Sequence, residues 1–489
     1  MSTVTNTLNS WTKQYIGGEW QEGNSQNSYT NKNPFDQSSL VSIKLASIKD
    51  IDASYKEAQQ AQIHWQQSNP SERADMMKKA AEVVESMREE IVSVLISETG
   101  SSVIKANVEV DLAIADIQEF ANIPFKMNSE IRSSVIPDKE NRVYRFPVGV
   151  VGVISPFNFP FYLSMRAIAP ALAAGNGVVA KPDLQTYISG GLIIAKVFEK
   201  VGLPKGLFNV VVVDIAEIGD TFVEHPIPQV ISFTGSTAVG RRIGGLCGKH
   251  LKRAALELGG NNVMIVLDDA DVNQAASAAV FGKFLHQGQI CMSLNRIIVH
   301  RNIYNEFVQV FKEKTAMLKA GNPANPEVFI GPLINEGQVN KIKSLVDQSI
   351  EQGANCILKG KIEGTFVEPI ILTDVTNDMA VAKNELFGPV AAILPVDSEE
   401  EAIRIANESD CGLSGAVFTG DVEHGVNVAL QVHTGMIHVN DQSVNCEPNI
   451  PFGGEKSSGL GRYGGEWSLD EFTTTRWVSV QKVPRPFPF

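Results

Sequence analysis

Short apolar runs alternate with helical stretches through most of the chain, and this alternation constrains the possible folds more than any other feature. Four runs have the length and β-branched composition of buried strands: residues 148–154, 177–180, 207–213 and 229–233. The helical stretches that follow them are residues 162–174, 189–200, 216–223 and 237–247. This order predicts parallel βαβ units in a doubly wound α/β sheet, whose ligands bind at the carboxyl ends of the strands.

A second α/β region follows at residues 262–444, where the segments VMIVL, RIIVH, AAILPV, GAVFTG and GMIHVN are predicted strands. Ahead of both regions, residues 51–99 and 105–127 have the apolar period of amphipathic helices. In the first of them Ser71 is the candidate N-cap and Gly100 the candidate stop. At about 150 residues per domain, the 489 residues suffice for roughly three domains.

Charge and cysteine content exclude several classes of protein. The formal net charge is −13, from 42 basic and 55 acidic residues, whereas a nucleic-acid-binding protein normally carries a basic patch. Five scattered cysteines with no Cys-x-x-Cys pair predict neither a disulfide framework nor a metal site. The polar start MSTVTNTLNSWTKQ lacks a signal sequence, and prolines interrupt the uncharged residues 146–165. We therefore expect a cytoplasmic protein that binds no metal, membrane or nucleic acid.

Two glycine-rich motifs are candidates for binding a phosphate. The GxGxxG string at residues 459–464 has no βαβ unit around it, so we interpret it as a flexible loop that does not contact a pyrophosphate. The segment FTGSTAVG, residues 233–240, stands at a strand end and opens a helix that Ser236 or Thr237 can cap. The free N–H groups of such a helix face a bound diphosphate, although many turns of this kind bind nothing.

Three residues carry reactive or polar groups in unusual local settings. Cys291 in FLHQGQICMSLNR is either a buried apolar residue or a nucleophile in an exposed turn. Glu257 precedes a Gly-Gly pair in ALELGGNN and is otherwise an ordinary surface glutamate. Asn158 lies in the turn SPFNFP, where turn chemistry alone also accounts for it.

The order and joint spacing of these elements decide between the alternatives. The chain resembles an aldehyde dehydrogenase over essentially its whole length. The resemblance rests on Asn158, FTGSTAVG, Glu257 at 34 residues before Cys291, ELFGPV and PFGGEKSSGLGR in this order. Within that superfamily, LELGGNN, FLHQGQICMSLNR and KPDLQT are most similar to the benzaldehyde and vanillin dehydrogenases. The resemblance implies an α/β fold with two doubly wound parallel sheets and a small β oligomerisation element.

The resemblance also implies domain boundaries and an assembly. The NAD(P)-binding domain is expected at residues 1–127 and 147–258, the catalytic domain at residues 259–455, and the oligomerisation element at residues 128–146 and 470–489. The expected assembly is a homodimer or a dimer-of-dimers tetramer.

Catalytic roles follow from the resemblance position by position. Cys291 attacks the aldehyde carbon, the Asn158 amide and the Cys291 backbone N–H hold the oxyanion, and Glu257 is the general base that hydrolyses the thioester. The expected cofactor-binding residues are Ile154, Ser155, Pro156, Phe157, Lys181, Gly235, Ser236, Gly240, Leu258, Gly259, Glu385 and Phe387.

Departures from the family pattern bear on the cofactor. Many NAD-preferring members carry a glutamate three residues after the lysine at position 181, and this chain has Leu184 there. The missing carboxylate predicts that both NAD and NADP are used, with Asp183 as a partial substitute. Two family glycines are replaced by Val213 and Ile215, which reshapes the adenine side, and Phe157 replaces the common tryptophan.

An apolar, partly aromatic lining is expected around the aldehyde, which predicts an aromatic substrate. The aligned positions are Phe159, Leu163, Arg166, Leu285, Ile290, Met292 and Phe452. Arg166 either contacts a ring substituent or forms a structural ion pair. The competing hypotheses are an aliphatic or semialdehyde dehydrogenase of the same superfamily and a non-catalytic, crystallin-like protein. Glu257 argues against a CoA-acylating enzyme, and packing alone does not require Asn158, Glu257 and Cys291 together.

Overall fold

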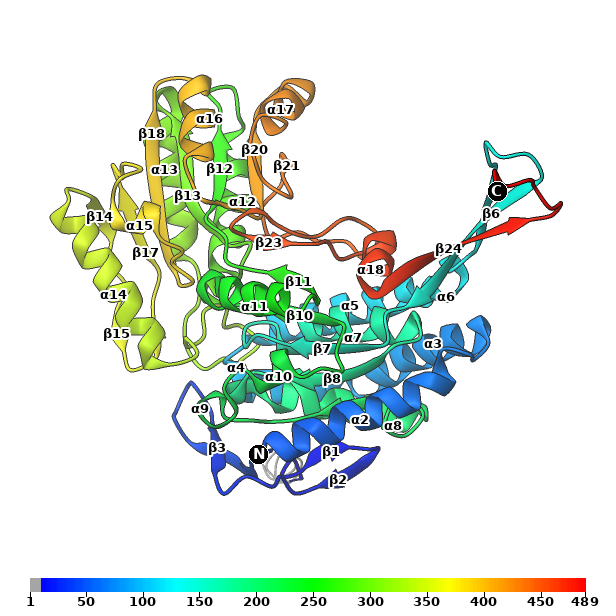
Figure 1. The fold of residues 1–489 in the computed structure, drawn as a ribbon. Helices are drawn as coiled ribbons and strands as arrows, with labels where there is room; N and C mark the ends of the chain where they lie inside the picture. The colour runs from blue at the N-terminus through cyan, green and yellow to red at the C-terminus, as the bar shows by residue number, and fades with distance from the viewer. Residues whose placement is uncertain (1–9) are drawn as a thin grey trace.

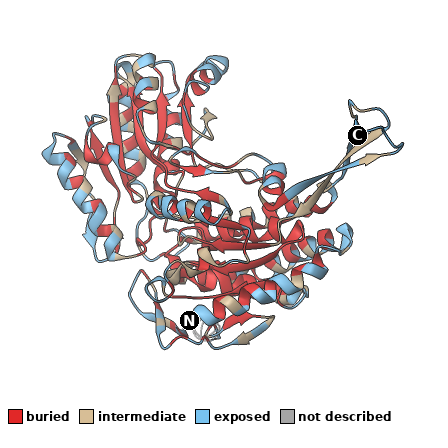
Figure 2. Cartoon of the chain, viewed as in Figure 1, coloured by how far each residue is buried: buried red, intermediate tan, exposed pale blue. Residues whose placement is uncertain are grey.

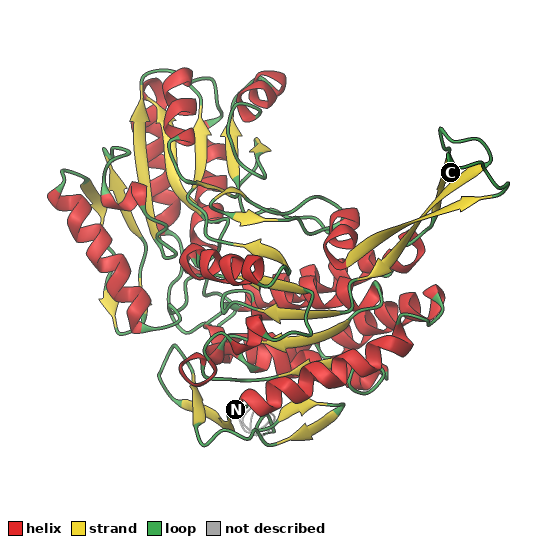
Figure 3. Ribbon diagram, in the orientation of Figure 1, coloured by secondary structure: helices red, strands yellow, loops and turns green. Residues whose placement is uncertain are grey.

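The computed structural model describes residues 10–489 as two α/β lobes with a projecting arm (Figure 1). Residues 1–9, the part of the chain interpreted above as the polar start without a signal sequence, lie outside the described residues. The central strands of both lobes are buried, whereas the strands of the arm are half-buried or exposed (Figure 2). Helices flank the strands of each lobe (Figure 3).

Short strands come first in the described part of the chain. Five separate helices then take the place of the two long helical segments expected. The strands are β1 (Gln14–Ile16), β2 (Glu19–Gln21), β3 (Ser28–Lys32) and β4 (Ser39–Lys44). The helices are α2 (Ile48–Trp65), α3 (Pro70–Ser86), α4 (Arg88–Thr99), α5 (Val103–Phe120) and α6 (Ile123–Lys126).

The predicted N-cap Ser71 is wrong, because Asn69 caps α3 and Pro70 occupies its first position. Proline lacks the N–H that a first helical residue leaves unpaired, and its ring disfavours a helical conformation in the residue before it. The chain therefore cannot continue as one helix through residues 51–99. The stop at Gly100 is confirmed, since this residue is left-handed with φ 68°.

The first lobe contains a sheet in the order β2-β1-β9-β8-β7-β10-β11-β23. Its parallel strands are β7 (Val150–Ile154), β8 (Gly177–Lys181), β9 (Phe208–Val210), β10 (Val230–Thr234) and β11 (Arg253–Glu257). Strand order reverses between β7 and β10, which is the switch point where doubly wound sheets bind ligands. The helical elements are α7 (Pro160–Ala173), η1 (Leu184–Thr186), η2 (Ile188–Leu192), α8 (Ile193–Val201), α9 (Ile215–Ile218), α10 (Thr221–Glu224) and α11 (Thr237–Lys249).

Two sequence predictions in this lobe are corrected. The third strand ends at Val210 rather than Val213, since Val212 N donates to the Gln14 side chain and Val213 makes only an isolated bridge to Ala46. The GxGxxG string is not a flexible loop, because β23 (Gly459–Leu460) pairs antiparallel with the end of β11. A Cβ on Gly459 would lie 2.4 Å from the Leu256 carbonyl oxygen, so the glycine permits this close pairing.

The second lobe contains a sheet in the order β14-β17-β18-β13-β12-β20-β21. Its strands are β12 (Asn262–Val266), β13 (Leu294–His300), β14 (Asn355–Leu358), β17 (Ile370–Thr373), β18 (Val390–Val396), β20 (Gly415–Phe418) and β21 (His438–Val439). Its helical elements are α12 (Val272–Phe284), η3 (Leu285–Gly288), α13 (Arg301–Ala316), α14 (Glu336–Glu351), α15 (Ala380–Lys383), α16 (Glu399–Asn407) and α17 (Val422–Ala429). Two small ribbons pair β15 (Ile362–Glu363) with β16 (Phe366–Val367) and β19 (Cys411–Gly412) with β22 (Glu455–Lys456).

The arm consists of β5 (Glu130–Arg132), β6 (Lys139–Pro147) and β24 (Thr473–Gln481), which follows α18 (Gly465–Phe472). β24 pairs with β6 along its full length, from Thr473 opposite Pro147 to Gln481 opposite Lys139. The uncharged residues 146–165 belong to β6, β7 and α7. Within residues 10–489, none of the helices combines the length and apolar character that a bilayer span requires.

Candidate active site

A cleft of about 500 Å³ lies at the switch point of the first sheet. The loop after β7 and the loop after β10 form two of its walls, and residues of the second lobe close it. Eleven of the twelve expected cofactor-binding residues line it: Ile154, Ser155, Pro156, Phe157, Lys181, Gly235, Ser236, Leu258, Gly259, Glu385 and Phe387. All three expected catalytic residues line it too: Asn158, Glu257 and Cys291.

Gly240, the twelfth expected residue, has a packing role inside α11. A Cβ at this position would lie 2.1 Å from Leu258 Cδ2. The glycine therefore lets α11 approach the strand end that carries Leu258, and Leu258 itself faces the cleft.

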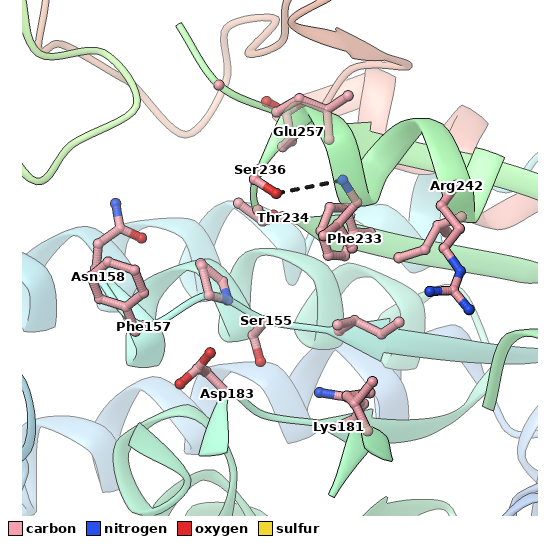
Figure 4. A pocket seen from close by; sticks show the side chains of 18 of the residues that line it. Ser155, Phe157, Asn158, Lys181, Asp183, Phe233, Thr234, Ser236, Arg242 and Glu257 are labelled. Carbon is pink, nitrogen blue, oxygen red and sulfur yellow. Dashed lines mark hydrogen bonds between the residues drawn. The ribbon is translucent and has the colours of Figure 1, made fainter. Parts of the chain in front are cut away.

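The N-terminus of α11 points at the cleft from the loop after β10. Ser236 caps the helix, its Oγ accepting from the backbone N–H of Val239 at 3.5 Å (Figure 4). An uncompensated helix N-terminus carries partial positive charge and free N–H groups, which favour a phosphate. Of the two expected caps, Ser236 and Thr237, the N-cap of α11 is Ser236.

The opposite wall carries charged residues, only some of which the sequence predicted. Lys181 and Asp183 lie beneath the loop that carries Ser155 and Phe157 (Figure 4). The Asp183 carboxylate accepts from Gln185 N at 2.9 Å, and burial raises its pKa. Leu184 begins η1 directly after Asp183 and does not line the cleft, whereas Asp183 does.

Several cleft residues were not predicted. They are Gly219, Asp220, Phe222, Val223, Arg242, Ile243, Gln338 and Lys341. Arg242 lies at the far end of the cleft from Asn158 (Figure 4) and pairs with Asp220 at 2.7 Å. Gln338 and Lys341 come from α14 of the second lobe.

Glu385 and the glycine pair after β11 hold the two lobes together at the cleft. Gly260 N donates to Glu385 Oε1 at 3.1 Å, and a Cβ on Gly259 would lie 2.5 Å from Glu385 Oε2. Phe387 has φ 52°, a conformation that costs energy for a non-glycine residue, and its ring meets Phe157 edge to face at 5.7 Å. A Cβ on Gly260 would lie 2.3 Å from the Cys291 carbonyl oxygen, so the backbone requires glycine at that position.

Cys291 is partly exposed at the inner end of the cleft. His286 and Gln287, in the loop before it, have φ values of 50° and 56°, so the chain turns sharply into the cleft. The Cys291 carbonyl oxygen accepts from Asn262 Nδ2 at 2.7 Å, which fixes the backbone. Burial, followed by the charges of Glu257 and Glu385, raises the pKa of the Cys291 thiol to about 12, against the charge of Arg166.

Glu257 ends β11 and is buried, so it is not a surface glutamate. Neither of its carboxylate oxygens has a hydrogen-bond partner. Burial raises the pKa of Glu257 to about 8, with the charge of Arg166 opposing the shift. An unpartnered buried carboxyl group is costly, and such groups concentrate at functional sites.

Asn158 lies on the loop between β7 and α7. Its Nδ2 donates to the Gln289 carbonyl oxygen at 3.0 Å, two residues before Cys291. An amide carries a second N–H, which stays available to an oxygen atom in the cleft. Asn158, Glu257 and Cys291 therefore line the same cleft although they come from three separate segments.

Six of the seven residues expected around the aldehyde belong to the hydrophobic core of the first lobe, against which Cys291 packs, and none of the seven lines the 500 Å³ cleft. The six are Phe159, Leu163, Leu285, Ile290, Met292 and Phe452. Phe452 also lines a second cavity, of about 370 Å³, together with residues 435–438, 445–447, 450 and 451. The guanidinium carbon of Arg166 lies 3.9 Å from the centroid of the Phe452 ring, and its buried Nη1 has no hydrogen-bond partner.

The sheet is doubly wound, and the cleft at its switch point carries a cysteine and a buried glutamate. This is the architecture of a dinucleotide-dependent oxidoreductase with a thiol at its reaction centre. The chain belongs to the aldehyde dehydrogenase family, whose sequence profile matches residues 20–478. The resemblance and the α/β fold expected from the sequence are thereby confirmed. The protein is an oxidoreductase that acts on aldehydes.

Similar proteins cover nearly the full length. A benzaldehyde dehydrogenase of Bacillus subtilis (strain 168) is 53% identical over 477 residues, 98% of each chain. A vanillin dehydrogenase of Corynebacterium glutamicum is 48% identical, over 96% of this chain and 98% of that one. The crystal structure of an NAD-dependent benzaldehyde dehydrogenase from Corynebacterium glutamicum superposes with a TM-score of 0.89 at 45% identity, over 96% of this chain and 98% of that one.

Among residues 10–489, no three His, Cys, Asp or Glu side chains gather as a metal site. The five cysteines are all free.

Proposed function

We propose that this protein oxidises aromatic aldehydes to carboxylic acids with NAD or NADP as the electron acceptor. The observation that carries the proposal is that Cys291, Glu257 and Asn158 line the same cleft as the capped N-terminus of α11. The relatives support the aromatic substrate, since those reported above are named for benzaldehyde and vanillin.

Cys291 is the proposed nucleophile. Loss of the thiol proton produces a thiolate, whose sulfur bonds to the aldehyde carbon as the carbonyl π electrons move to oxygen. The second Asn158 N–H and the Cys291 backbone N–H donate to that oxyanion, and each such donor is worth roughly 3 kcal/mol of barrier. Collapse of the oxyanion breaks the aldehyde C–H bond and leaves a thioester on Cys291.

Glu257 is the proposed base for the second half of the reaction. Its carboxylate takes a proton from a water molecule as the water oxygen attacks the thioester carbon. The C–S bond breaks, the carboxylic acid leaves, and Cys291 is restored. The absence of any hydrogen-bond partner on Glu257 leaves both of its oxygens free for this water.

The residues of the cleft fit a nicotinamide dinucleotide. The capped N-terminus of α11 suits its diphosphate, Lys181 and Asp183 its adenosine ribose, and Glu385 its second ribose. When bound, the nicotinamide ring accepts the hydride released from the aldehyde.

The aldehyde is proposed to lie against the cluster of Phe159, Leu163, Leu285, Ile290, Met292 and Phe452. The cavity that Phe452 lines supports an approach from that side. Arg166 is proposed to take a polar ring substituent, supported by its unpartnered Nη1 beside the Phe452 ring.

Benzaldehyde is expected to exceed acetaldehyde in kcat/KM by about 10- to 100-fold, because burying an aromatic ring contributes roughly 1.5–3 kcal/mol. The measurement is the absorbance of reduced nicotinamide with purified protein, NAD and each aldehyde in parallel. Equal or faster turnover of acetaldehyde would discard the aromatic substrate while keeping the chemistry.

We propose that the enzyme uses NADP as well as NAD. Leu184 leaves no carboxylate at its own position, and Arg242 and Lys341 add positive charge to the cleft. The NAD-dependent relative supports NAD, and Asp183 opposes a 2′-phosphate through charge repulsion.

Asp183→Asn is therefore expected to raise kcat/KM for NADP relative to NAD by about 10-fold, since like charges in a cleft cost a few kcal/mol at most. Asparagine still accepts from Gln185 N, so the cap of η1 is kept. Steady-state kinetics with both nucleotides measure the ratio, and an unchanged ratio would rule Asp183 out as the discriminating residue.

We also propose that the arm joins subunits into a homodimer or a dimer of dimers. Trp477 and Ile131 on it are 65% and 70% exposed, which favours burial against another chain. A monomeric mass in sedimentation would refute this.

A cytoplasmic location is proposed because the reactive Cys291 and the other free thiols require a reducing compartment. Fractionation of cells tests this location.

A further inference from the structure

A buried ion pair lies behind the loop that carries Asn158. Lys105 and Glu109 stand one turn apart on α5, and both side chains are 0% exposed. Lys105 Nζ donates to Glu109 Oε2 at 2.5 Å. The helix that carries them packs against α7, which begins immediately after Asn158.

Glu109 completes the N-terminus of α7. Phe159 occupies the N-cap position and cannot accept a hydrogen bond through its side chain. Glu109 Oε1 instead accepts from the backbone N–H groups of Phe161 and Tyr162, at 2.9 and 3.2 Å. A carboxylate at a helix N-terminus satisfies its free donors and its partial positive charge. The carboxylate therefore anchors the start of α7 from a different helix.

Lys105 holds the residue just before that helix. Its Nζ donates to the Asn158 carbonyl oxygen at 2.7 Å and lies 4.1 Å from the centroid of the Phe159 ring. His286 packs edge to face with that ring at 5.7 Å, and burial together with the charge of Lys105 lowers the pKa of His286. The main chain of Asn158 is thus fixed by an ammonium group, while its side chain reaches toward the Cys291 loop.

We propose that Lys105 and Glu109 are positioning residues that aim the Asn158 amide at the oxyanion. The inference rests on the proposed function, in which Asn158 is an oxyanion donor. Packing alone does not explain the pair, because two buried charges are costly and apolar residues of similar size often serve as well. The pair contacts neither aldehyde nor cofactor; it acts through the backbone of Asn158.

The experiment is a double-mutant cycle between the pair and Asn158. Lys105→Met alone leaves Glu109 buried and unpaired, so the main variant is Lys105→Met with Glu109→Gln, which removes both charges and keeps an acceptor for Phe161 N. Lys56→Met is the matched control, since Lys56 pairs with Asp52 at the same spacing on α2 but is 60% exposed.

The readouts are the burst rate of reduced nicotinamide with benzaldehyde, the Kd for NAD and the thermal unfolding curve. The paired variant is expected to lower the burst rate about 10- to 100-fold with the Kd for NAD unchanged, since small misplacement of an aligned group costs up to about 100-fold. Asn158→Ala is expected to lower it about 10²- to 10³-fold. Adding the paired change to Asn158→Ala is expected to lower the burst rate no further. Lys56→Met is expected to have the burst rate of the wild type.

Three results would overturn the inference. A paired variant within twofold of the wild type, beside an impaired Asn158→Ala, would reject positioning and leave the oxyanion role intact. Losses that multiply in the combined variant would show that the pair acts independently of Asn158. A fully active Asn158→Ala would refute the proposed oxyanion role itself.

Discussion

Replacing Cys291 by alanine is expected to lower the rate of aldehyde-dependent NAD reduction by at least about 10⁴-fold. Without the sulfur no thiohemiacetal forms, and the remaining groups of the site have no covalent intermediate to act on. The Asn158 amide and Glu257 still surround the vacated position, so the loss reports the nucleophile rather than collapse of the cleft.

The measurement is steady-state absorbance of reduced nicotinamide with benzaldehyde, beside an NAD-binding titration. Cys291 is partly buried and alanine removes only its sulfur atom, so the Kd for NAD is expected to stay within a few fold. Cys356→Ala is the control: this cysteine lies on β14 of the second lobe and lines neither cavity described above. A Cys291→Ala protein that keeps a tenth of the wild-type rate would refute the covalent mechanism.

The residues of the cleft that the sequence could predict are those that belong to local motifs. The loop after a strand, the Ser236 cap and the Gly259–Gly260 turn each have a signature within a few residues. The α/β fold followed from the same kind of local pattern, because strand and helix periods differ.

Other parts of the site depend on the approach of distant segments. Gln338 and Lys341 reach the cleft from the second lobe, and no local pattern in α14 distinguishes its inner face from an ordinary helix. Lys105 and Glu109 belong to an amphipathic segment whose apolar period predicted only scaffold. Their partners are some 50 residues away, from Lys105 to Asn158 (|i−j| 53) and from Glu109 to Phe161 (|i−j| 52).

The chemical state of a residue is likewise absent from the sequence. The pattern ALELGGNN places a carboxylate before a turn, and a solvated surface residue fitted it equally well. Only the fold reveals that β23 covers the end of β11 and that Glu257 is buried without a partner.

Glu257→Gln is the second substitution with a large expected effect, a loss of about 10²- to 10⁴-fold in kcat. Glutamine keeps the shape of the side chain but cannot accept a proton from water. The thioester then accumulates, and each active site is expected to release one equivalent of reduced nicotinamide in a burst before turnover nearly stops. Stopped-flow absorbance with benzaldehyde measures burst and steady state together, and a variant without a burst but with slow steady turnover would assign Glu257 to an earlier step.

The pH dependence gives an independent test of the same residue. Since the pKa of Glu257 is raised to about 8, the carboxylate that acts as base is the minor form at neutral pH. Wild-type kcat is therefore expected to rise as the pH increases through about 8, and this ascending limb is expected to disappear in Glu257→Gln. An ascending limb of the same pKa in the variant would show that another group titrates.

As the pH rises, the free energy of unfolding is expected to fall while kcat rises. The unfolded chain releases the Glu257 proton near the ordinary pKa of 4.5, whereas the folded protein holds it up to about 8, so the native state loses stability as pH rises between these values. At about 1.4 kcal/mol per pKa unit the loss reaches about 5 kcal/mol above pH 8. Glutamine carries no such proton, so Glu257→Gln is expected to unfold several degrees higher than the wild type at pH 8.5 and at the same temperature near pH 4. A variant that is inactive yet more stable only at high pH identifies a buried carboxylate kept for catalysis, and equal unfolding temperatures at pH 8.5 would refute that role for its burial.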